Sequence, residues 1–380
     1  MKEKLGQQNI PYKVMIEDVQ KLIDSRPVSD NKARAISLDT YTYTEYHPMD
    51  EIYTWMELIK DKHSNLVAQH LLGHTYEERP IYYFKIGFPA ARTKKVIFMD
   101  CGIHAREWIA PAYCQWFVKE ILARQNEPLI NKLLKQVDFY VVPVVNVDGY
   151  IYSFTTDRLW RKNRSPHDNG TCFGVDLNRN FDSHWGTIGT SPDCESILFC
   201  GPRPASEFET QGVVRLLEPM KSNTLMYLTI HSYGQYILLP YGHTYLPSVN
   251  HYEMTKAAEK AADELKKKYN TEYHVGSTAA ILYYTSGSSA DWASDLDILL
   301  SYTYELRDEG SFAFELPADQ IEPTCEETWD SMVSLFQHID EKHLGPLEDD
   351  DDNDGAAALS THWIHMIISF SVCMYYALIR

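Results

Sequence analysis

Apolar runs alternate with amphipathic stretches along most of this chain, which is the pattern of strands that alternate with helices. Continuous apolar runs, typical of strands buried on both faces, span 96–99, 139–145 and 225–230. Two further strands are predicted over 81–86 and 301–304. Apolar residues at helical spacing predict helices over 51–61, 111–123, 252–269 and 328–342. This alternation indicates an α/β fold, with a mixed sheet flanked by helices on both faces.

The N-terminal part of the chain has a weaker pattern. Residues 11–16 predict an edge strand, and residues 17–24 predict one or two helical turns. Residues 146–149, with the sequence NVDG, predict a turn directly after one of the buried strands.

Three of the predicted strands lead into residues that can bind a metal ion or exchange a proton. The strand over 96–99 runs into a stretch that holds His104 and Glu107, while the strands over 225–230 and 301–304 end on His231 and Glu305. A single histidine or glutamate in such a place is more often structural or solvated. Because open α/β sheets bind ligands at the carboxyl ends of their strands, we expect these residues to converge. An imidazole and a carboxylate so placed can bind one zinc ion and leave coordination positions open.

Composition narrows the class of protein. The 380 residues suffice for one large α/β domain, and 44% hydrophobic with 23% charged residues is typical of a globular chain. A net charge of −18 argues against nucleic-acid binding, which needs a basic surface. The seven cysteines contain no CxxC pair, so a cysteine zinc site is not expected.

Several separated motifs resemble, in order and spacing, those of the zinc carboxypeptidases of the carboxypeptidase A/B family. They are CGIHAREW (101–108), NVDGY (146–150), WRKNR (160–164), VDLNRN (175–180), HSY (231–233) and ELRD (305–308), followed by Phe314. The specificity loop over 282–292 resembles most closely the carboxypeptidase O branch of that family. The resemblance covers residues 35–345 and implies one catalytic domain built on a mixed eight-stranded sheet with helices on both faces.

The resemblance also implies the parts of the active site. One zinc ion per chain would be bound by His104, Glu107 and His231. Glu305 would act as general base, and Arg164 would stabilise the oxyanion. Asp176 would fix the tautomer of a zinc-bound histidine.

A second implied group of residues binds the substrate. Asn178 and Arg179 would clamp the terminal carboxylate, since a guanidinium matches a carboxylate with two parallel hydrogen bonds. Tyr283 would close on the substrate. The other implied subsite residues are Arg106, Tyr233, Ala290 and Phe314. The site thus predicts a metallocarboxypeptidase that releases single C-terminal residues from peptides and proteins. A catalytically silent peptide-binding relative and an N-acyl amino acid amidase remain as alternatives.

The residue to be removed depends on Ala290, which matches the base of the specificity pocket. In the family a large apolar residue there goes with apolar C-terminal side chains, an acid with basic ones, and an arginine, as in the carboxypeptidase O branch, with acidic ones. Ala290 departs from that arginine. Because an unpaired buried charge is costly, we expect neutral, apolar or aromatic C-terminal residues.

The cysteines and the N-terminal segment suggest where the protein works. Cys172 and Cys194 match the family's disulfide pair, which implies an oxidising compartment. Cys101, Cys114 and Cys325 are expected to be buried thiols, and Cys200 has no assignable partner. Residues 1–34 resemble the last part of an inhibitory propeptide, with the activation cut at Arg34. No signal peptide follows Met1, so either the natural start lies upstream or the pro-region is curtailed.

The C-terminal segment predicts membrane attachment. Residues 346–355 form an acidic linker, with six acids in the seven residues 348–354. Residues 356–380 are mostly apolar, which fits a GPI-anchor signal with Asn353 or Gly355 as the attachment residue. A single-span anchor is the alternative. We therefore expect a monomer on the extracellular face of the plasma membrane, GPI-anchored or secreted.

Overall fold

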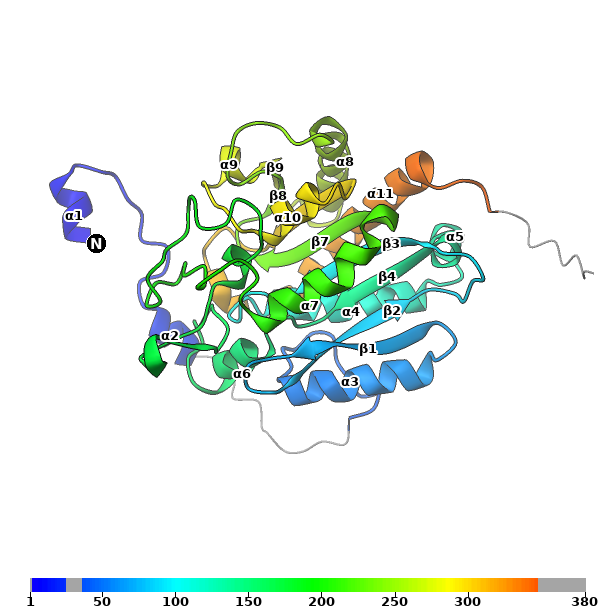
Figure 1. Ribbon diagram of the computed structural model, residues 1–380, viewed down its shortest axis with the longest axis horizontal. Coiled ribbons are helices and arrows are strands. Elements are labelled where there is room, and N and C mark those ends of the chain that lie inside the picture. The colour runs from blue at the N-terminus through cyan, green and yellow to red at the C-terminus, as the bar shows by residue number, and fades with distance from the viewer. Residues whose placement is uncertain (1, 25–35, 348–380) are drawn as a thin grey trace, which may run out of the picture. The chain divides into compact units, whose positions relative to one another are not determined.

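A computed structural model describes residues 2–24 and 36–347 (Figure 1). The predicted cut at Arg34 and the segment 348–380, which includes nearly all of the acidic linker and the apolar terminus, lie outside the described residues. Two short helices, α1 (Lys2–Gln7) and α2 (Val19–Asp24), form the N-terminal segment. The predicted strand over 11–16 is wrong, since these residues form neither strand nor helix.

An eight-stranded sheet forms the centre of the catalytic domain, in the order β1-β2-β4-β3-β7-β10-β8-β9. Its strands are β1 (Val67–His74), β2 (Pro80–Ile86), β3 (Lys95–Cys101), β4 (Val137–Val142), β7 (Thr224–Ser232), β8 (Tyr236–Leu239), β9 (His274–Ser277) and β10 (Leu300–Leu306). Strands β4, β3, β7 and β10 are mutually parallel, whereas β2 and β8 run antiparallel to them. The mixed eight-stranded sheet is therefore confirmed.

The central strands coincide with the apolar runs because they are covered on both faces. All nine residues of β7 are buried, as are six of the seven in β3. The run that begins as β4 ends at Val142 rather than Val145, directly before Pro143. A proline has no N–H group with which to continue a ladder.

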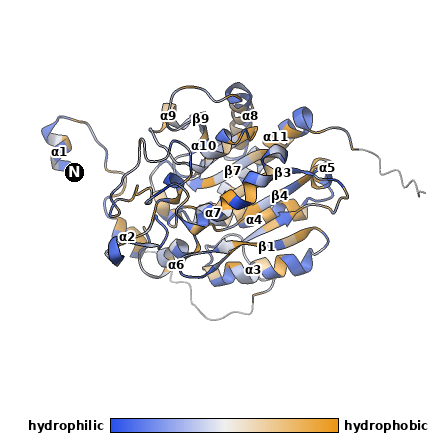
Figure 2. Cartoon of the chain, viewed as in Figure 1, coloured by the Kyte–Doolittle hydropathy of each residue, from blue (hydrophilic) through white to orange (hydrophobic). Residues whose placement is uncertain are grey.

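Helices cover both faces of the sheet (Figure 1). On one side, four helices pack together: α4 (Ile109–Ala123), α5 (Pro128–Gln136), α8 (His251–Tyr269) and α11 (Ile321–His343). Elsewhere, helices α3 (Met49–Lys62) and α7 (Phe208–Leu217) contact β1, and α10 (Ser289–Asp295) contacts β7 and β10. Figure 2 shows both hydrophobic and hydrophilic residues on α3, and its buried residues include Ile52, Trp55 and Ile59.

Several shorter elements complete the domain. They are α6 (Val147–Thr155), the two-stranded ribbon β5 (Pro166–His167) with β6 (Cys172–Phe173), and α9 (Thr278–Ile281). The turn predicted over 146–149 is the beginning of α6, and Asn146 caps it by accepting a hydrogen bond from the Gly149 amide. The last helix, α11, begins at Ile321, seven residues before its predicted start at 328.

Two disulfides tie these elements together. Cys172–Cys194 is the predicted pair. The expectation that Cys101 and Cys114 are thiols is wrong, because they form a second disulfide between the end of β3 and α4. Helix α4 packs against β3, and the two Cα atoms lie 6.3 Å apart, within reach of a disulfide. Cys200 and Cys325 are buried thiols.

Candidate active site

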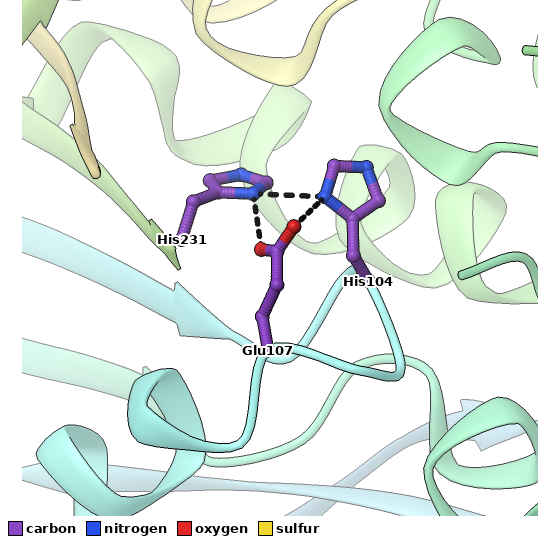
Figure 3. Close-up of side chains that lie close together, drawn as sticks. All are labelled: His104, Glu107 and His231. Atoms are coloured by element: carbon purple, nitrogen blue, oxygen red, sulfur yellow. Dashed lines mark hydrogen bonds and ion pairs between the residues drawn. The ribbon is translucent and has the colours of Figure 1, made fainter. Parts of the chain in front are cut away.

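Three potential metal ligands meet at the carboxyl edge of the sheet (Figure 3). His104 and Glu107 lie in the loop between β3 and α4, and His231 lies near the end of the neighbouring strand β7. His104 Nδ1 is 2.8 Å from Glu107 Oε1 and 3.1 Å from His231 Nδ1, and His231 Nδ1 is 3.0 Å from Glu107 Oε2. All three side chains are buried.

The donor set of these residues fits a zinc ion. Both Nδ1 atoms and both carboxylate oxygens face one another, which concentrates lone pairs in one place. Burial and the charge of Arg161 lower the pKa of His104, so its ring is neutral at pH 7. Burial alone would raise the pKa of Glu107, but His104 and His231 hold it well below its usual range. Two imidazoles and one carboxylate are a known zinc donor set that leaves a position open.

A carboxylate behind His104 sets its tautomer. Asp176 is fully buried, with Oδ1 3.1 Å from His104 Nε2, and its other oxygen accepts hydrogen bonds of 3.0 and 2.9 Å from Arg161 Nε and Nη2. Burial alone would raise the pKa of Asp176, but the charge of Arg161 holds it well below its usual range. The ionised Asp176 therefore accepts a hydrogen bond from the Nε2–H group of His104, which leaves the Nδ1 lone pair free for a metal.

A chain of hydrogen bonds, which the sequence analysis did not predict, supports His231 from behind. Its Nε2 is 3.0 Å from Thr229 Oγ1, and that hydroxyl donates a 2.7 Å hydrogen bond to Asp100 Oδ1. Tyr227 donates to the other oxygen of Asp100 at 2.5 Å. Burial raises the pKa of Asp100 to about 6 despite both hydrogen bonds. The sequence did contain a sign of this arrangement. Tyr227, Thr229 and His231 alternate along β7, and alternate residues of a strand share one face.

Two arginines of the WRKNR motif occupy different places. Arg161 lies beside the ligands, with Nη1 3.2 Å from His104 Nδ1 and 3.7 Å from Glu107 Oε1. Arg164, the residue predicted for the oxyanion, instead places its guanidinium carbon 3.8 Å from the ring centre of Tyr152 and 4.5 Å from that of Trp160. Arg164 thus packs on aromatic rings, and the arginine of this motif that lies beside the ligands is Arg161, to which the prediction assigned no role.

Glu305 lies one strand away from the ligands. It pairs in register with His231 across the parallel strands β10 and β7, so the two side chains leave the same face of the sheet. Burial raises the pKa of Glu305 to about 8, against the opposing effect of His231. A carboxyl group with a pKa near neutrality, next to a metal site, is suited to proton transfer.

The residues of the predicted carboxylate clamp lie in a short 3₁₀ turn, η2 (Leu177–Arg179). Asn178 Oδ1 accepts a 2.9 Å hydrogen bond from the Ser289 amide. The buried Arg179 donates through Nη1 to the Asn178 carbonyl at 2.8 Å. The structure thus joins the clamp to the start of α10, where Ala290 is also buried.

Tyr283 lies over this clamp. Its ring centre is 5.9 Å from the Arg179 guanidinium carbon, and 49% of the residue is exposed. The exposed ring has room to move toward a bound ligand.

The remaining predicted residues form one cluster. The guanidinium carbon of Arg106 lies 4.0 Å from the ring centre of Phe314, and Phe314 meets Tyr233 edge to face at 5.0 Å. Burial and the charge of Arg161 lower the pKa of Arg106 to about 10, which leaves it charged at neutral pH. Because Arg106 lies between His104 and Glu107 in the sequence, this cluster adjoins the potential metal ligands.

Comparisons with known proteins agree with this geometry. Residues 52–331 match the family model described as zinc carboxypeptidase, and residues 1–26 match the carboxypeptidase activation peptide. The chain is 58% identical to carboxypeptidase O of Bos taurus over 80% of this chain and 82% of the relative. It is 56% identical to carboxypeptidase O of Homo sapiens, with 83% and 85% covered. A crystal structure of thrombin activatable fibrinolysis inhibitor superposes with a TM-score of 0.83 at 38% identity, covering 90% of this chain and 85% of that one.

Proposed function

The chain belongs to the zinc carboxypeptidase family, and from that premise we propose which residues carry each part of C-terminal peptide-bond hydrolysis. It is a metallocarboxypeptidase that uses one zinc ion. The observation that supports the assignment is the convergence of His104, Glu107 and His231, with Glu305 in register with His231 on the neighbouring strand.

His104, Glu107 and His231 hold the metal. When bound, zinc supplies a Lewis acid that polarises the scissile carbonyl and lowers the pKa of water. Asp176 and Thr229 accept hydrogen bonds from the Nε2–H groups of His104 and His231, which would leave both Nδ1 lone pairs free for the metal.

Glu305 is the general base. It accepts a proton from the attacking water and returns it to the leaving amine. Its raised pKa and its register with His231 support this role. Glu305→Gln keeps the shape of the side chain but cannot accept the proton, so kcat falls by about 10²–10⁴-fold while zinc content stays the same.

Arg161 stabilises the oxyanion in place of the predicted Arg164. Its guanidinium is the cation beside the metal ligands, and its double hydrogen bond to Asp176 fixes its orientation. A donor that is held in place before the reaction pays no reorganisation cost when the negative charge develops.

Asn178 and Arg179 bind the terminal carboxylate of the substrate, and Tyr283 closes over it. The clamp restricts cleavage to the last peptide bond because only the C-terminal residue carries a carboxylate on its main chain. The contacts of Asn178 with Ser289 and of Arg179 with Asn178 pre-form this clamp. Arg106, Tyr233 and Phe314 contact the preceding residue of the substrate.

The preferred C-terminal residue is neutral, with an apolar or aromatic side chain. Ala290 provides no charge at the pocket base. The neighbouring carboxylate of Asp291 is occupied by the Gly242 amide at 2.9 Å and by His243 Nδ1 at 3.2 Å. A charged substrate side chain would therefore be buried without a partner.

Steady-state rates on three peptides that differ only in a terminal Phe, Glu or Lys test this specificity. We expect the highest kcat/KM for Phe, and Ala290→Arg should move the preference toward Glu. A clear preference of the unmodified protein for Glu would contradict the specificity while leaving the metallocarboxypeptidase activity intact. Loss of Phe release on adding a chelator, and its recovery with zinc, tests the activity itself. N-acyl amino acids in the same assay separate a peptidase from an amidase.

The protein works outside the cell. Its two disulfides and the match of its first residues to an activation peptide indicate a secreted or extracellular protein. We infer four segments: residues 1–34 as an activation segment, 35–345 as the monomeric catalytic domain, 346–355 as a linker, and 356–380 as a GPI signal.

Attachment through a GPI anchor rests on the composition of the terminal segment. Within 2–24 and 36–347, the structure contains no helix that is both long and apolar enough to span a bilayer. Treatment of intact cells with phosphoinositide-specific phospholipase C should release the protein. Retention on the cells would favour a single-span anchor, and a chain that ends at residue 347 should be found in the medium.

A further inference from the structure

A second group of metal-binding side chains lies outside the active site. Glu253 projects from the first turn of α8, and His338 and His343 lie in the last two turns of α11. Within the described part of the chain, two groups of three or more His, Cys, Asp or Glu residues have ligand atoms that all lie within 4.8 Å of one another. They are this trio and the trio of His104, Glu107 and His231. The second trio shares no residue with the site already described.

Both imidazoles point at one carboxylate oxygen. His338 Nε2 is 2.9 Å from Glu253 Oε1, and His343 Nε2 is 2.5 Å from the same atom. The two rings lie 5.9 Å apart, centre to centre, at an angle of 56°. Two imidazole nitrogens and a carboxylate oxygen therefore converge from two helices.

The end of α11 makes this convergence possible. His343 lies five positions after His338, a spacing that would point the two side chains in different directions on a regular helix. The Leu344 amide, however, bonds to the Ile339 carbonyl five residues back, which widens the last turn. Helix α8 packs along α11 (Figure 1), so Glu253 meets both rings at the point where α11 ends.

The surroundings suit a bound cation that solvent can reach. The side chains of His338, His343 and Glu253 are 15%, 20% and 31% exposed, so a metal ion can enter and keep water as a further ligand. Burial alone would raise the pKa of Glu253, but the hydrogen bonds from the two rings lower it, so its carboxylate is ionised at neutral pH. Imidazole and carboxylate ligands suit zinc, and also nickel, cobalt and copper.

We propose that Glu253, His338 and His343 form a second divalent-metal site, which takes zinc or a similar transition-metal ion and fastens α8 to the end of α11. Because its ligands come from two helices of the folded domain, the ion binds the native state and stabilises it. The site is structural and requires nothing of the peptidase machinery.

The test measures metal content and thermal stability, neither of which depends on catalysis. Full-length protein with its catalytic zinc is dialysed into a buffer in which zinc chloride is the only source of transition metal, and zinc per chain is counted by mass spectrometry. We expect two zinc ions in the unmodified protein and one in His343→Gln. At a zinc concentration a hundred times Kd, the melting temperature of the unmodified protein should rise by about 4 °C.

Two further variants keep the result interpretable. His274→Gln removes an exposed histidine on β9 and should still bind two ions. Glu253→Gln changes a different helix, so it replaces His343→Gln if that variant does not fold. A count of one zinc ion in the unmodified protein overturns the proposal. It is also overturned if a folded His343→Gln or Glu253→Gln variant binds as much zinc, and shows the same rise in melting temperature, as the unmodified protein. Peptide hydrolysis at equimolar zinc should be the same in all of them, so failure of this site is distinct from failure of the peptidase assignment.

Discussion

The two arginines of the WRKNR motif give the sharpest test of the active site. Arg161→Ala removes the guanidinium that lies 3.2 Å from His104 Nδ1, and Arg164→Ala removes one that lies 3.8 Å from the ring centre of Tyr152. The substitutions are chemically identical and three residues apart. Their effects therefore differ only through the places that the fold gives them.

The magnitudes follow from those places. Loss of an oxyanion donor costs about 10²–10³-fold in kcat, or roughly 2.7–4 kcal/mol of transition-state stabilisation, and we expect this of Arg161→Ala with KM little changed. It also leaves Asp176 without its buried partner, and breaking such a pair costs about 3–5 kcal/mol of stability. Arg164→Ala loses stacking on aromatic rings, at about 0.5–2 kcal/mol of stability, and keeps its kcat.

The assay is hydrolysis of a blocked dipeptide that ends in Phe, with kcat and KM determined separately. Zinc content is measured on the same samples, because Arg161 contacts Asp176 and Asp176 holds His104. Arg161→Lys is the companion variant. It retains a charge near Asp176 but loses the planar fork, so we expect zinc retention with a reduced kcat.

One pattern of results would refute the reasoning. If Arg164→Ala lowered kcat a hundredfold while the zinc-loaded Arg161→Ala kept its activity, the oxyanion would depend on Arg164 as the sequence motif first suggested. Loss of activity in Arg161→Ala through loss of zinc alone would also overturn the oxyanion role, and would leave Arg161 as a residue that positions Asp176.

Three further predictions concern stability and metal binding. Burial raises the pKa of Glu209 to about 8. The folded protein therefore holds this proton more tightly than the unfolded chain, and the resulting stabilisation is complete below the unfolded pKa of the carboxyl group. It is lost as the pH rises from that value to about 8, at up to about 1.4 kcal/mol per pH unit. Glu209→Gln should therefore flatten the fall of the melting temperature between pH 5 and 9, whereas the exposed Glu341→Gln should not; equal slopes would contradict the shift. Replacing Cys101 and Cys114 together by serine opens a loop with a sequence separation of 13 and should lower the free energy of unfolding in urea by about 3 kcal/mol; an unchanged value would count against it. Asp176→Asn should weaken zinc binding by about 10–100-fold in competition with a chelator, and an unchanged affinity would show that His104 does not need its partner.

The centre of the fold was predictable because strands that are buried on both faces appear in the sequence as continuous apolar runs. The runs over 96–99, 139–145 and 225–230 became the adjacent parallel strands β3, β4 and β7. Strands β1, β8 and β9 were missed. Two of these have only four residues, and β1 at the edge of the sheet mixes buried with exposed positions. Short or half-exposed strands have no such continuous run.

The candidate site was predictable only for residues that lie at or just after the ends of strands. His104, Glu107, His231 and Glu305 follow or end strands that are parallel in the sheet, so their meeting could be expected. The distinction between Arg161 and Arg164 could not, because both lie in one loop motif and only tertiary packing determines which side chain turns toward the metal.

The Cys101–Cys114 disulfide closes a ring of backbone that contains both His104 and Glu107. In a newly made, reduced chain, this short stretch holds two thiols as well as the histidine and the carboxylate. Thiolates are strong zinc ligands, so the reduced stretch would compete for the ion in a geometry unrelated to the active site. Oxidation withdraws both sulfur atoms and leaves only the intended ligands. Oxidative folding before metal loading would therefore leave His104 and Glu107 as the zinc ligands of this stretch.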